Sequence, residues 1–274
     1  MAELSRKEVI QLLASAGGQN MGARLSGVDL SGLDLRGLNF QHADLRLANL
    51  GAAVLMKADL RQATLAGATL DHADLSECDL EGAVLSNAGL HDARLAKSNL
   101  RQAVLTAADA IGADLHDADM TEARLTLADF SSADLSRVVL LRARMSKVHL
   151  GGADLIDAVL QHAELSDANL DLANCTRANF SHAYLQRASL IETNLFWANL
   201  RDANLTEAIL LRANLANADC SRATLRGTQL RGAVLRDANL SEATLRDAQV
   251  EPEALAYAIL AGTRMPDGNR LAGD

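Results

Sequence analysis

The chain has 274 residues and a formal net charge of −9, from 26 basic and 35 acidic residues, and only 3% of its residues are aromatic. Acidic and basic residues are interspersed, so the sequence lacks the basic footprint that non-specific binding to nucleic acid or to an anionic membrane requires. Because aromatic residues are so few, the core must be built mainly from Leu and Ala, which excludes an ordinary globular core.

The first predicted element is a short amphipathic helix over residues 6–16. Ser5 and Glu8 match a capping box, apolar residues follow, and Gly17-Gly18 ends the pattern. We expect residues 1–20 to cap the structure that follows. The charged first residues do not resemble a signal peptide, and the sequence has no run of 18 apolar residues, so we expect a cytoplasmic protein.

The next segment repeats every five residues from Leu25 to Val250. By direct count, Leu fills 37 of the 46 positions whose numbers end in 0 or 5, and Ala fills 37 of the 46 positions two residues earlier. The template is A-[D/N]-L-x-x. In a helix a five-residue step would advance about 500°, so the leucines would not form a stripe. In a strand, Ala and Leu two residues apart point the same way, and the chain must then turn.

The repeat also varies with a period of 20 residues. Asp or Asn precedes the central residue in 24 of the 46 repeats, but unevenly: in 17 of 22 on the side that contains Leu35 and the next side, which contains Phe40, and in only 7 of 24 on the other two sides. Such an asymmetry is expected if four repeats make one turn of a coil whose four sides differ in exposure or turn geometry.

This template resembles that of the pentapeptide-repeat family over residues 21–250. The resemblance implies an all-β fold, a right-handed quadrilateral parallel β-helix with four repeats per coil and short capping helices at both ends. Coils about 4.8 Å apart would make roughly eleven layers and a rod about 55 Å long.

The last predicted element follows Pro252, which is well placed as a first helical residue before the apolar run EALAYAIL. A turn is predicted at Met265–Gly268. We expect residues 251–274 to form a C-terminal capping helix and tail. The two ends resemble those of cyanobacterial family members, and a coil capped at both ends favours a monomer, with a dimer as the alternative.

The sequence predicts no catalytic residue, metal site or cofactor, because no nucleophile, phosphate-loop or metal-ligand motif is present. Two columns of polar residues at 20-residue spacing leave alternatives open. The first is a pair of stacked histidines with an aspartate, interpreted as solvated: His162, His182 and Asp202. The second is an aspartate ladder, open to interpretation as a cation site, an acidic docking strip or the ordinary template position: Asp114, Asp134 and Asp154. The three cysteines occupy core positions and are expected to be buried: Cys78, Cys175 and Cys220.

Large apolar residues at outward positions, which elsewhere hold Ser, Thr, Arg, Asp or Gly, are the candidates for a partner-binding surface. The candidates are Val139, Leu141, Ile156, Val159, Ile191, Phe196, Trp197, Ile209 and Leu211. Trp197 is the only tryptophan of the chain, and Trp is a favoured anchor of protein interfaces.

Two functions follow as hypotheses. The first is a non-catalytic scaffold or regulator that binds an unidentified protein through its surface, as the resemblance to cyanobacterial members implies. The alternative is a DNA mimic that binds DNA gyrase and protects it from inhibitors, as other members of the family do. Duplex DNA carries about one charge per 1.7 Å, or about 32 over 55 Å, so a net charge of −9 favours the scaffold.

Overall fold

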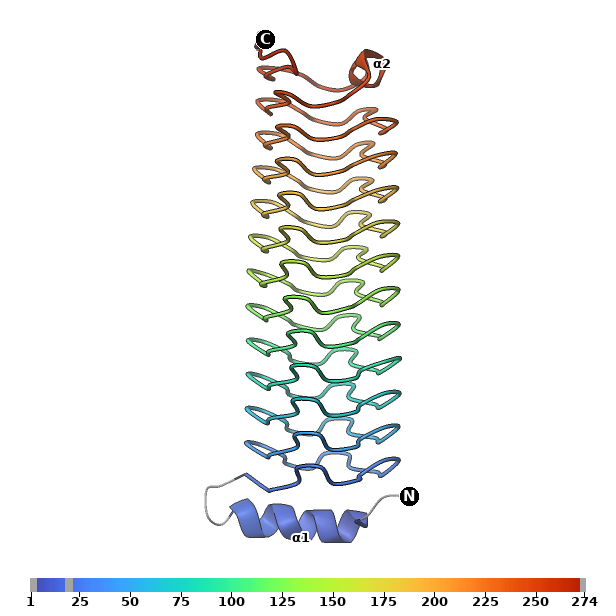
Figure 1. Cartoon of the computed structure of the whole chain (residues 1–274), viewed down its shortest axis with the longest axis vertical. Helices are drawn as coiled ribbons and strands as arrows, with labels where there is room; N and C mark the ends of the chain where they lie inside the picture. Colours follow the sequence, from blue (N-terminus) through green and yellow to red (C-terminus); the bar gives the residue numbers. More distant parts are fainter. Residues whose placement is uncertain (1–3, 18–21, 272–274) are drawn as a thin grey trace. The chain divides into compact units, whose positions relative to one another are not determined.

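The computed structural model describes residues 4–17 and 22–271 and divides the chain into two compact units, Met1–Val139 and Leu140–Asp274. Within each unit the chain winds in coils of 20 residues (Figure 1). Residues that precede the core positions form single parallel bridges with the residues 20 further on, such as Arg24 with Asp44 in the first unit and Arg144 with Glu164 in the second. Four such bridge positions occur in every 20 residues, so each coil has four sides.

The coil spacing follows from backbone hydrogen bonds that link each coil to the next. The amide of Leu45 donates to the carbonyl of Thr64 (2.8 Å), and the amide of Asp44 donates to the carbonyl of Ala23 (2.8 Å). A tight turn closes each repeat: the amide of Ala48 donates to the carbonyl of Leu45 (3.1 Å), and Leu47 has a φ of 58°. Non-glycine residues rarely adopt such a φ, but here the turn is fixed on both sides, because the Leu47 amide also donates to the carbonyl of Ala66 (3.1 Å).

The core of each unit is a set of columns of Leu side chains bordered by columns of Ala. From Leu25 to Leu245 the core positions are at most 2% exposed. Larger and smaller residues compensate for each other in places: Ala110 and Phe130 occupy the same column in successive coils, and both are fully buried. For this pair we expect the summed volume of the two side chains to matter more than the identity of either one.

Helix α1 (Arg6–Gly17) lies against the first coil (Figure 1). Its capping box forms as predicted: the Ser5 amide donates to Oε2 of Glu8 (2.7 Å), and the Glu8 amide donates to Oγ of Ser5 (3.4 Å). Arg6 donates to the Asp34 carbonyl and to Asp34 Oδ1 (3.1 Å), and Val9 is fully buried. Gly18, expected as part of the stop signal, lies outside the described residues.

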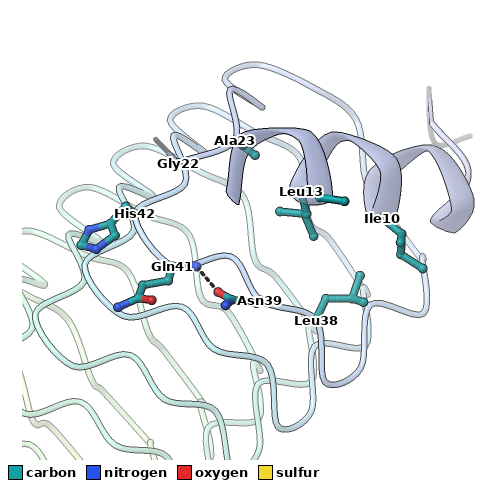
Figure 2. Close-up of a pocket in the computed structure, with 10 residues that line it drawn as sticks. Ile10, Leu13, Gly22, Ala23, Leu38, Asn39, Gln41 and His42 are labelled. Atoms are coloured by element: carbon teal, nitrogen blue, oxygen red, sulfur yellow. Dashed lines mark hydrogen bonds between the residues drawn. The ribbon is translucent and has the colours of Figure 1, made fainter. Parts of the chain in front are cut away.

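A cavity of about 410 Å³ remains between α1 and the first coil. Figure 2 shows Ile10 and Leu13 pointing from α1 toward Leu38. Polar groups line the other side of the cavity, where Asn39 accepts a hydrogen bond from the amide of Gln41 (2.9 Å).

The C-terminal end differs from the expectation of a capping helix and tail that begin where the repeat stops. Helix α2 (Pro252–Leu255) has only four residues, and the bridges continue beyond it, from Asn239 to Ile259 and from Thr244 to Arg264. The reason is in the sequence, because the spacing of small and large apolar residues resumes after α2, as Ala258 with Leu260 and Thr263 with Met265. No helix in the described ranges is long and apolar enough to cross a membrane.

Candidate protein-binding surface

The most exposed of the predicted site residues is Trp197, which lies in a turn of the second unit. The turn is closed by the amide of Ala198, which donates to the carbonyl of Leu195 (3.0 Å). Trp197 has a φ of 59°, and its amide donates to the carbonyl of Ala216 (3.2 Å). With the backbone held in this way, 58% of Trp197 is exposed.

The indole of Trp197 is held by the neighbouring ring of Phe196. Their centroids are 6.1 Å apart and the ring planes meet at 77°, an edge-to-face arrangement that is worth about 0.5–1.5 kcal/mol beyond the buried area. Phe196 is half-buried, and its amide donates to Oδ1 of Asn194 (3.3 Å). The backbone that carries the aromatic pair is therefore fixed from the strand side as well as from the turn.

Asn194 belongs to a ladder of amide side chains that runs beside the aromatic pair. Its Nδ2 donates to Oδ1 of Asn174 (3.3 Å) and to Oγ1 of Thr176 (2.9 Å), and its Oδ1 accepts from Nδ2 of Asn214 (3.0 Å). Side chains that bond to one another across coils lose little freedom on binding, so the surface around Trp197 is pre-organised.

A charged residue and a polar residue flank Trp197 along its own column. One coil earlier, Arg177 donates from Nε and Nη2 to the two carboxylate oxygens of Asp157 (2.7 and 2.6 Å). The hydrogen bond and the charge of Asp157 raise the pKa of Arg177. One coil later the column holds Asn217. The exposed indole thus has a polar and charged rim.

Ile156 occupies the Phe196 column two coils earlier, with Thr176 between them. It is half-buried. We call Ile156, Phe196 and Trp197 the Trp197 surface.

A second apolar cluster of the same unit lies at another corner of the coil. Ile191, Ile209 and Leu211, which the sequence predicted, are each half-buried. Leu172, which the sequence reading missed, is 65% exposed, and its amide donates to the carbonyl of Ile191 (2.9 Å). A leucine at a turn position that mostly holds charged residues, polar residues or glycine was the signal that could have identified it.

The structure does not join the predicted residues into one patch, because the side of the coil that carries the asparagine ladder lies between the corner of Ile191 and that of Phe196. Leu141 and Val159 are half-buried neighbours on adjacent coils, since the amide of Leu140 donates to the carbonyl of Val159 (2.7 Å). Val139 belongs to the first unit, where it bridges with Asp119.

The C-terminal end of the second unit exposes apolar residues that the sequence reading did not single out. Val234, Tyr257 and Ile259 are 48%, 71% and 53% exposed. Beside them an apolar cavity of about 430 Å³ opens, and it is lined by Val250, Pro252, Leu255, Ala256, Leu260, Met265 and Pro266. Of the core positions of this last coil, Leu255 is buried, whereas Val250, Leu260 and Met265 are only half-buried.

Acidic and basic side chains at the turns pair between successive coils. Asp167 bonds with Arg187 (2.8 Å), and Asp202 with Arg222. The hydrogen bond from Arg222 lowers the pKa of Asp202. These pairs place a positive charge beside each carboxylate, and opposite charges on neighbouring strands attract.

The predicted polar columns are partly confirmed. The rings of His162 and His182 stack, with centroids 4.9 Å apart and planes 9° apart, and Nε2 of His182 lies 3.8 Å from Oδ2 of Asp202. In the aspartate ladder, Asp114 and Asp134 bridge directly within the first unit, and Asp154 belongs to the second.

The three cysteines are buried and unpaired with one another, as predicted. Burial raises the pKa of the Cys78 and Cys220 thiols to about 12, and it also raises the pKa of the Cys175 thiol. Thiols with such a raised pKa stay protonated at neutral pH, and a protonated thiol is a poor nucleophile and a poor metal ligand.

Comparison with known proteins places these features in a family. The model of the pentapeptide repeats matches successive segments from residue 22 to residue 251. No curated protein matches the chain. Among solved structures, HetL of Nostoc sp. strain PCC 7120, a pentapeptide repeat protein involved in heterocyst differentiation regulation, is 28% identical, with 98% of this chain and 100% of HetL covered and a TM-score of 0.33.

Two further structures illustrate the range of the matches. Rfr23 of Cyanothece 51142 is 25% identical, with 51% of this chain and 93% of Rfr23 covered and a TM-score of 0.34. QnrB1, a plasmid-mediated fluoroquinolone resistance protein, is 17% identical, with 86% and 93% covered and a TM-score of 0.37. Since none of these TM-scores reaches 0.5, the assignment rests on the repeat match, which covers most of the sequence: the chain belongs to the pentapeptide-repeat family.

Proposed function

We propose that this chain is a non-catalytic scaffold that binds another protein through the Trp197 surface, on a β-helix with the right-handed, quadrilateral coil of its family. The observation that carries the proposal is the indole of Trp197, which is 58% exposed and held edge-on against Phe196. An exposed, rigid tryptophan loses little side-chain freedom on binding and supplies a large apolar contact area, which is why Trp dominates the binding energy of many interfaces.

The surroundings of Trp197 indicate what the partner offers. The indole requires an apolar pocket, and the rim formed by the Asp157–Arg177 pair and the asparagine ladder requires polar groups that can reach those side chains. A pocket with a polar rim is the usual complement of such an anchor, because the rim keeps water away from the central contact.

The test is an affinity capture with the wild-type chain and with Trp197→Asp, followed by mass spectrometry. The matched control is Leu47→Asp, because Leu47 is 70% exposed and occupies the same kind of turn position, with φ 58°, in the first unit. We expect one protein to be retained by the wild type and by Leu47→Asp and lost with Trp197→Asp, while circular dichroism of all three is unchanged. Retention of the same protein by Trp197→Asp would contradict the proposal.

DNA gyrase is the alternative partner, although a net charge of −9 is well below that of a DNA duplex of comparable length. A DNA duplex presents phosphates that no cationic side chain neutralises. In this chain, arginines pair with carboxylates between coils, as in Asp167–Arg187 and Asp202–Arg222, which argues against mimicry of a duplex. A supercoiling assay with purified gyrase and a fluoroquinolone distinguishes the two: protection of gyrase that persists in Trp197→Asp would support the alternative over the scaffold.

A further inference from the structure

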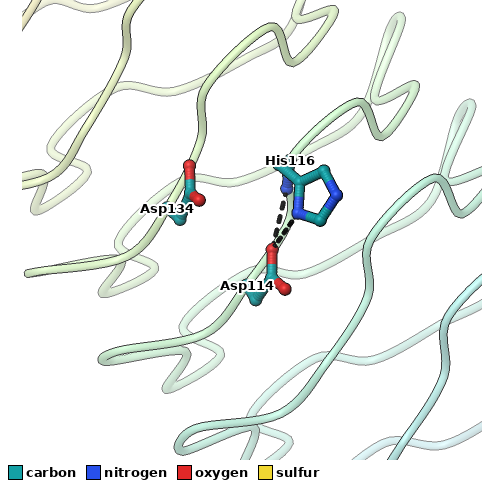
Figure 3. A group of neighbouring side chains, drawn as sticks. All are labelled: Asp114, His116 and Asp134. Carbon is teal, nitrogen blue, oxygen red and sulfur yellow. Dashed lines mark hydrogen bonds and ion pairs between the residues drawn. The ribbon is translucent and has the colours of Figure 1, made fainter.

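Three side chains of the first unit with metal-ligating atoms lie together: Asp114, His116 and Asp134 (Figure 3). One ligand atom from each lies within 4.8 Å of the other two. Asp114 and Asp134 occupy equivalent positions on successive coils, where they form a parallel bridge, and His116 follows Asp114 in the turn of the same coil. The cluster therefore links two coils.

The backbone holds one oxygen of each carboxylate in place. Oδ1 of Asp114 accepts a hydrogen bond from the amide of His116 (3.2 Å) and lies 2.6 Å from Nδ1 of the His116 ring. Oδ1 of Asp134 accepts from the amide of Ser136 (2.9 Å). Each carboxylate has a second oxygen that can coordinate a cation while the first keeps its backbone bond.

The two carboxylates repel each other, because like charges directly opposite on adjacent strands are unfavourable. Arg94 precedes Asp114 by one coil in the same column, but its guanidinium lies toward Asp74 on the other side (3.9 Å). A cation bound between Asp114 and Asp134 would remove this repulsion.

We propose that Asp114, His116 and Asp134 form a site for a divalent first-row transition cation such as Zn²⁺. Carboxylate oxygens alone would suit Mg²⁺ or Ca²⁺, and the imidazole shifts the preference toward the transition metals. Zinc binds nitrogen and oxygen at about 2.0–2.2 Å, so tetrahedral ligand atoms lie about 3.3 Å apart. Coordination by Nδ1 of His116 replaces the 2.6 Å contact of this atom with Oδ1 of Asp114, and rotations of these partly exposed side chains bring the second carboxylate oxygens to the metal. Water completes the coordination.

Other histidines of the chain provide internal controls. His91 lies 3.1 Å from Asp109, and His72 lies 3.7 Å from Asp92, but among residues 4–17 and 22–271 only the Asp114 cluster brings three such groups together. The stacked pair of His162 and His182 is the main competitor for a transition metal.

The experiment is a calorimetric titration of ZnCl₂ into the full chain after treatment with EDTA and dialysis, with MgCl₂ and CaCl₂ titrated separately. The variants that test the site are His116→Ala and Asp134→Asn. Both residues fit their positions, because Ala96 occupies the His116 position one coil earlier and the template accepts Asn in place of Asp. The control variants are His91→Ala and His162→Ala, and circular dichroism establishes that every variant is folded.

We expect zinc to bind the wild type and both control variants equally, and to bind His116→Ala and Asp134→Asn at least about tenfold more weakly, since the loss of even an outer-shell partner costs about 10–100-fold. We expect Mg²⁺ and Ca²⁺ to bind more weakly than zinc. The proposal is overturned if zinc does not bind the wild type, if His162→Ala is the variant that loses it, or if His116→Ala binds as the wild type does. Binding of Ca²⁺ that depends on Asp134 but not on His116 would also overturn it.

Discussion

The buried pair Ala110 and Phe130 offers a quantitative test of how the core is built. Both residues occupy core positions of one column in successive coils of the first unit, and both are at most 1% exposed. The bridge between Asp109 and Asp129 places the two positions next to each other. At the other positions of this column from Leu30 to Leu230, the core residue is Leu. We therefore expect the large ring of Phe130 to occupy the volume that Ala110 leaves.

The expected energies follow from the side-chain carbons. Phe130→Leu removes three carbons, which at about 0.8 kcal/mol per buried methylene costs about 2.4 kcal/mol, and the cavity left beside Ala110 adds to this cost. Ala110→Leu adds three carbons beside the intact ring and costs about 1–3 kcal/mol through overpacking. The double variant restores the original number of carbons with the residue that fills the rest of the column, so its stability should lie within about 1 kcal/mol of the wild type.

Thermal and urea unfolding of the four proteins measure these terms. For chains of 150–250 residues each kcal/mol shifts Tm by about 2–4 °C, so Phe130→Leu should melt about 5 °C or more below the wild type and Ala110→Leu about 2–12 °C below it, and the double variant should recover most of that loss. If the losses of the two single variants simply add in the double variant, Phe130 does not fill the space beside Ala110, and the account of a column with a fixed summed volume is wrong.

Three further predictions concern the reactivity of the buried thiols, the stability of the fold at acid pH and the attachment of α1 to the first coil. Because burial raises the pKa of Cys78 and Cys220 to about 12, a thiol reagent at pH 8 should label the unfolded chain only, and rapid labelling of the folded chain would be inconsistent with the core assignment. The hydrogen bond from Arg61 lowers the pKa of Asp59, so the stabilisation of the fold by this pair is complete above the ordinary Asp pKa of about 3.9 and is lost as the pH falls through the lowered pKa. Asp59→Asn should therefore reduce the loss of folding stability at acid pH, and an unchanged loss would argue against this pair. Arg6→Ala removes the bonds to the first coil and should speed amide exchange in α1 but not in the coils; equal protection in both proteins would show that apolar contacts alone hold the helix.

The repeat and its register were readable from the sequence, because both depend on local periodicity. A five-residue period with a 20-residue modulation predicts which residues stack, and the stacked rings of His162 and His182 follow from that register. The N-terminal helix was predictable because Ser5 and Glu8 form a local capping motif. The C-terminal end was harder to predict from the sequence, because the template is interrupted at Pro252 and resumes only at Ala258.

The candidate surface was predictable only in part. Outward position predicts that a side chain leaves the core, but exposure depends on its place in the turn, whose first residue is mostly half-buried and whose second residue is mostly exposed. Ile191 and Leu211 occupy the first place, whereas Leu172, which is 65% exposed, occupies the second. The cluster of Asp114, His116 and Asp134 needs two successive coils and a turn in one place, which a search for ligand motifs along the chain does not detect.

The most direct test of the proposed function uses Trp197 as its own probe, because it is the only tryptophan of the chain. An indole that is 58% exposed should emit at long wavelength and be quenched readily by acrylamide. When a tryptophan-free form of the partner obtained in the capture experiment is titrated in, we expect the emission to shift to shorter wavelength and the quenching to fall, in proportion to the bound fraction. Saturated binding with unchanged emission and quenching would place the interface elsewhere and contradict the central role given to the Trp197 surface.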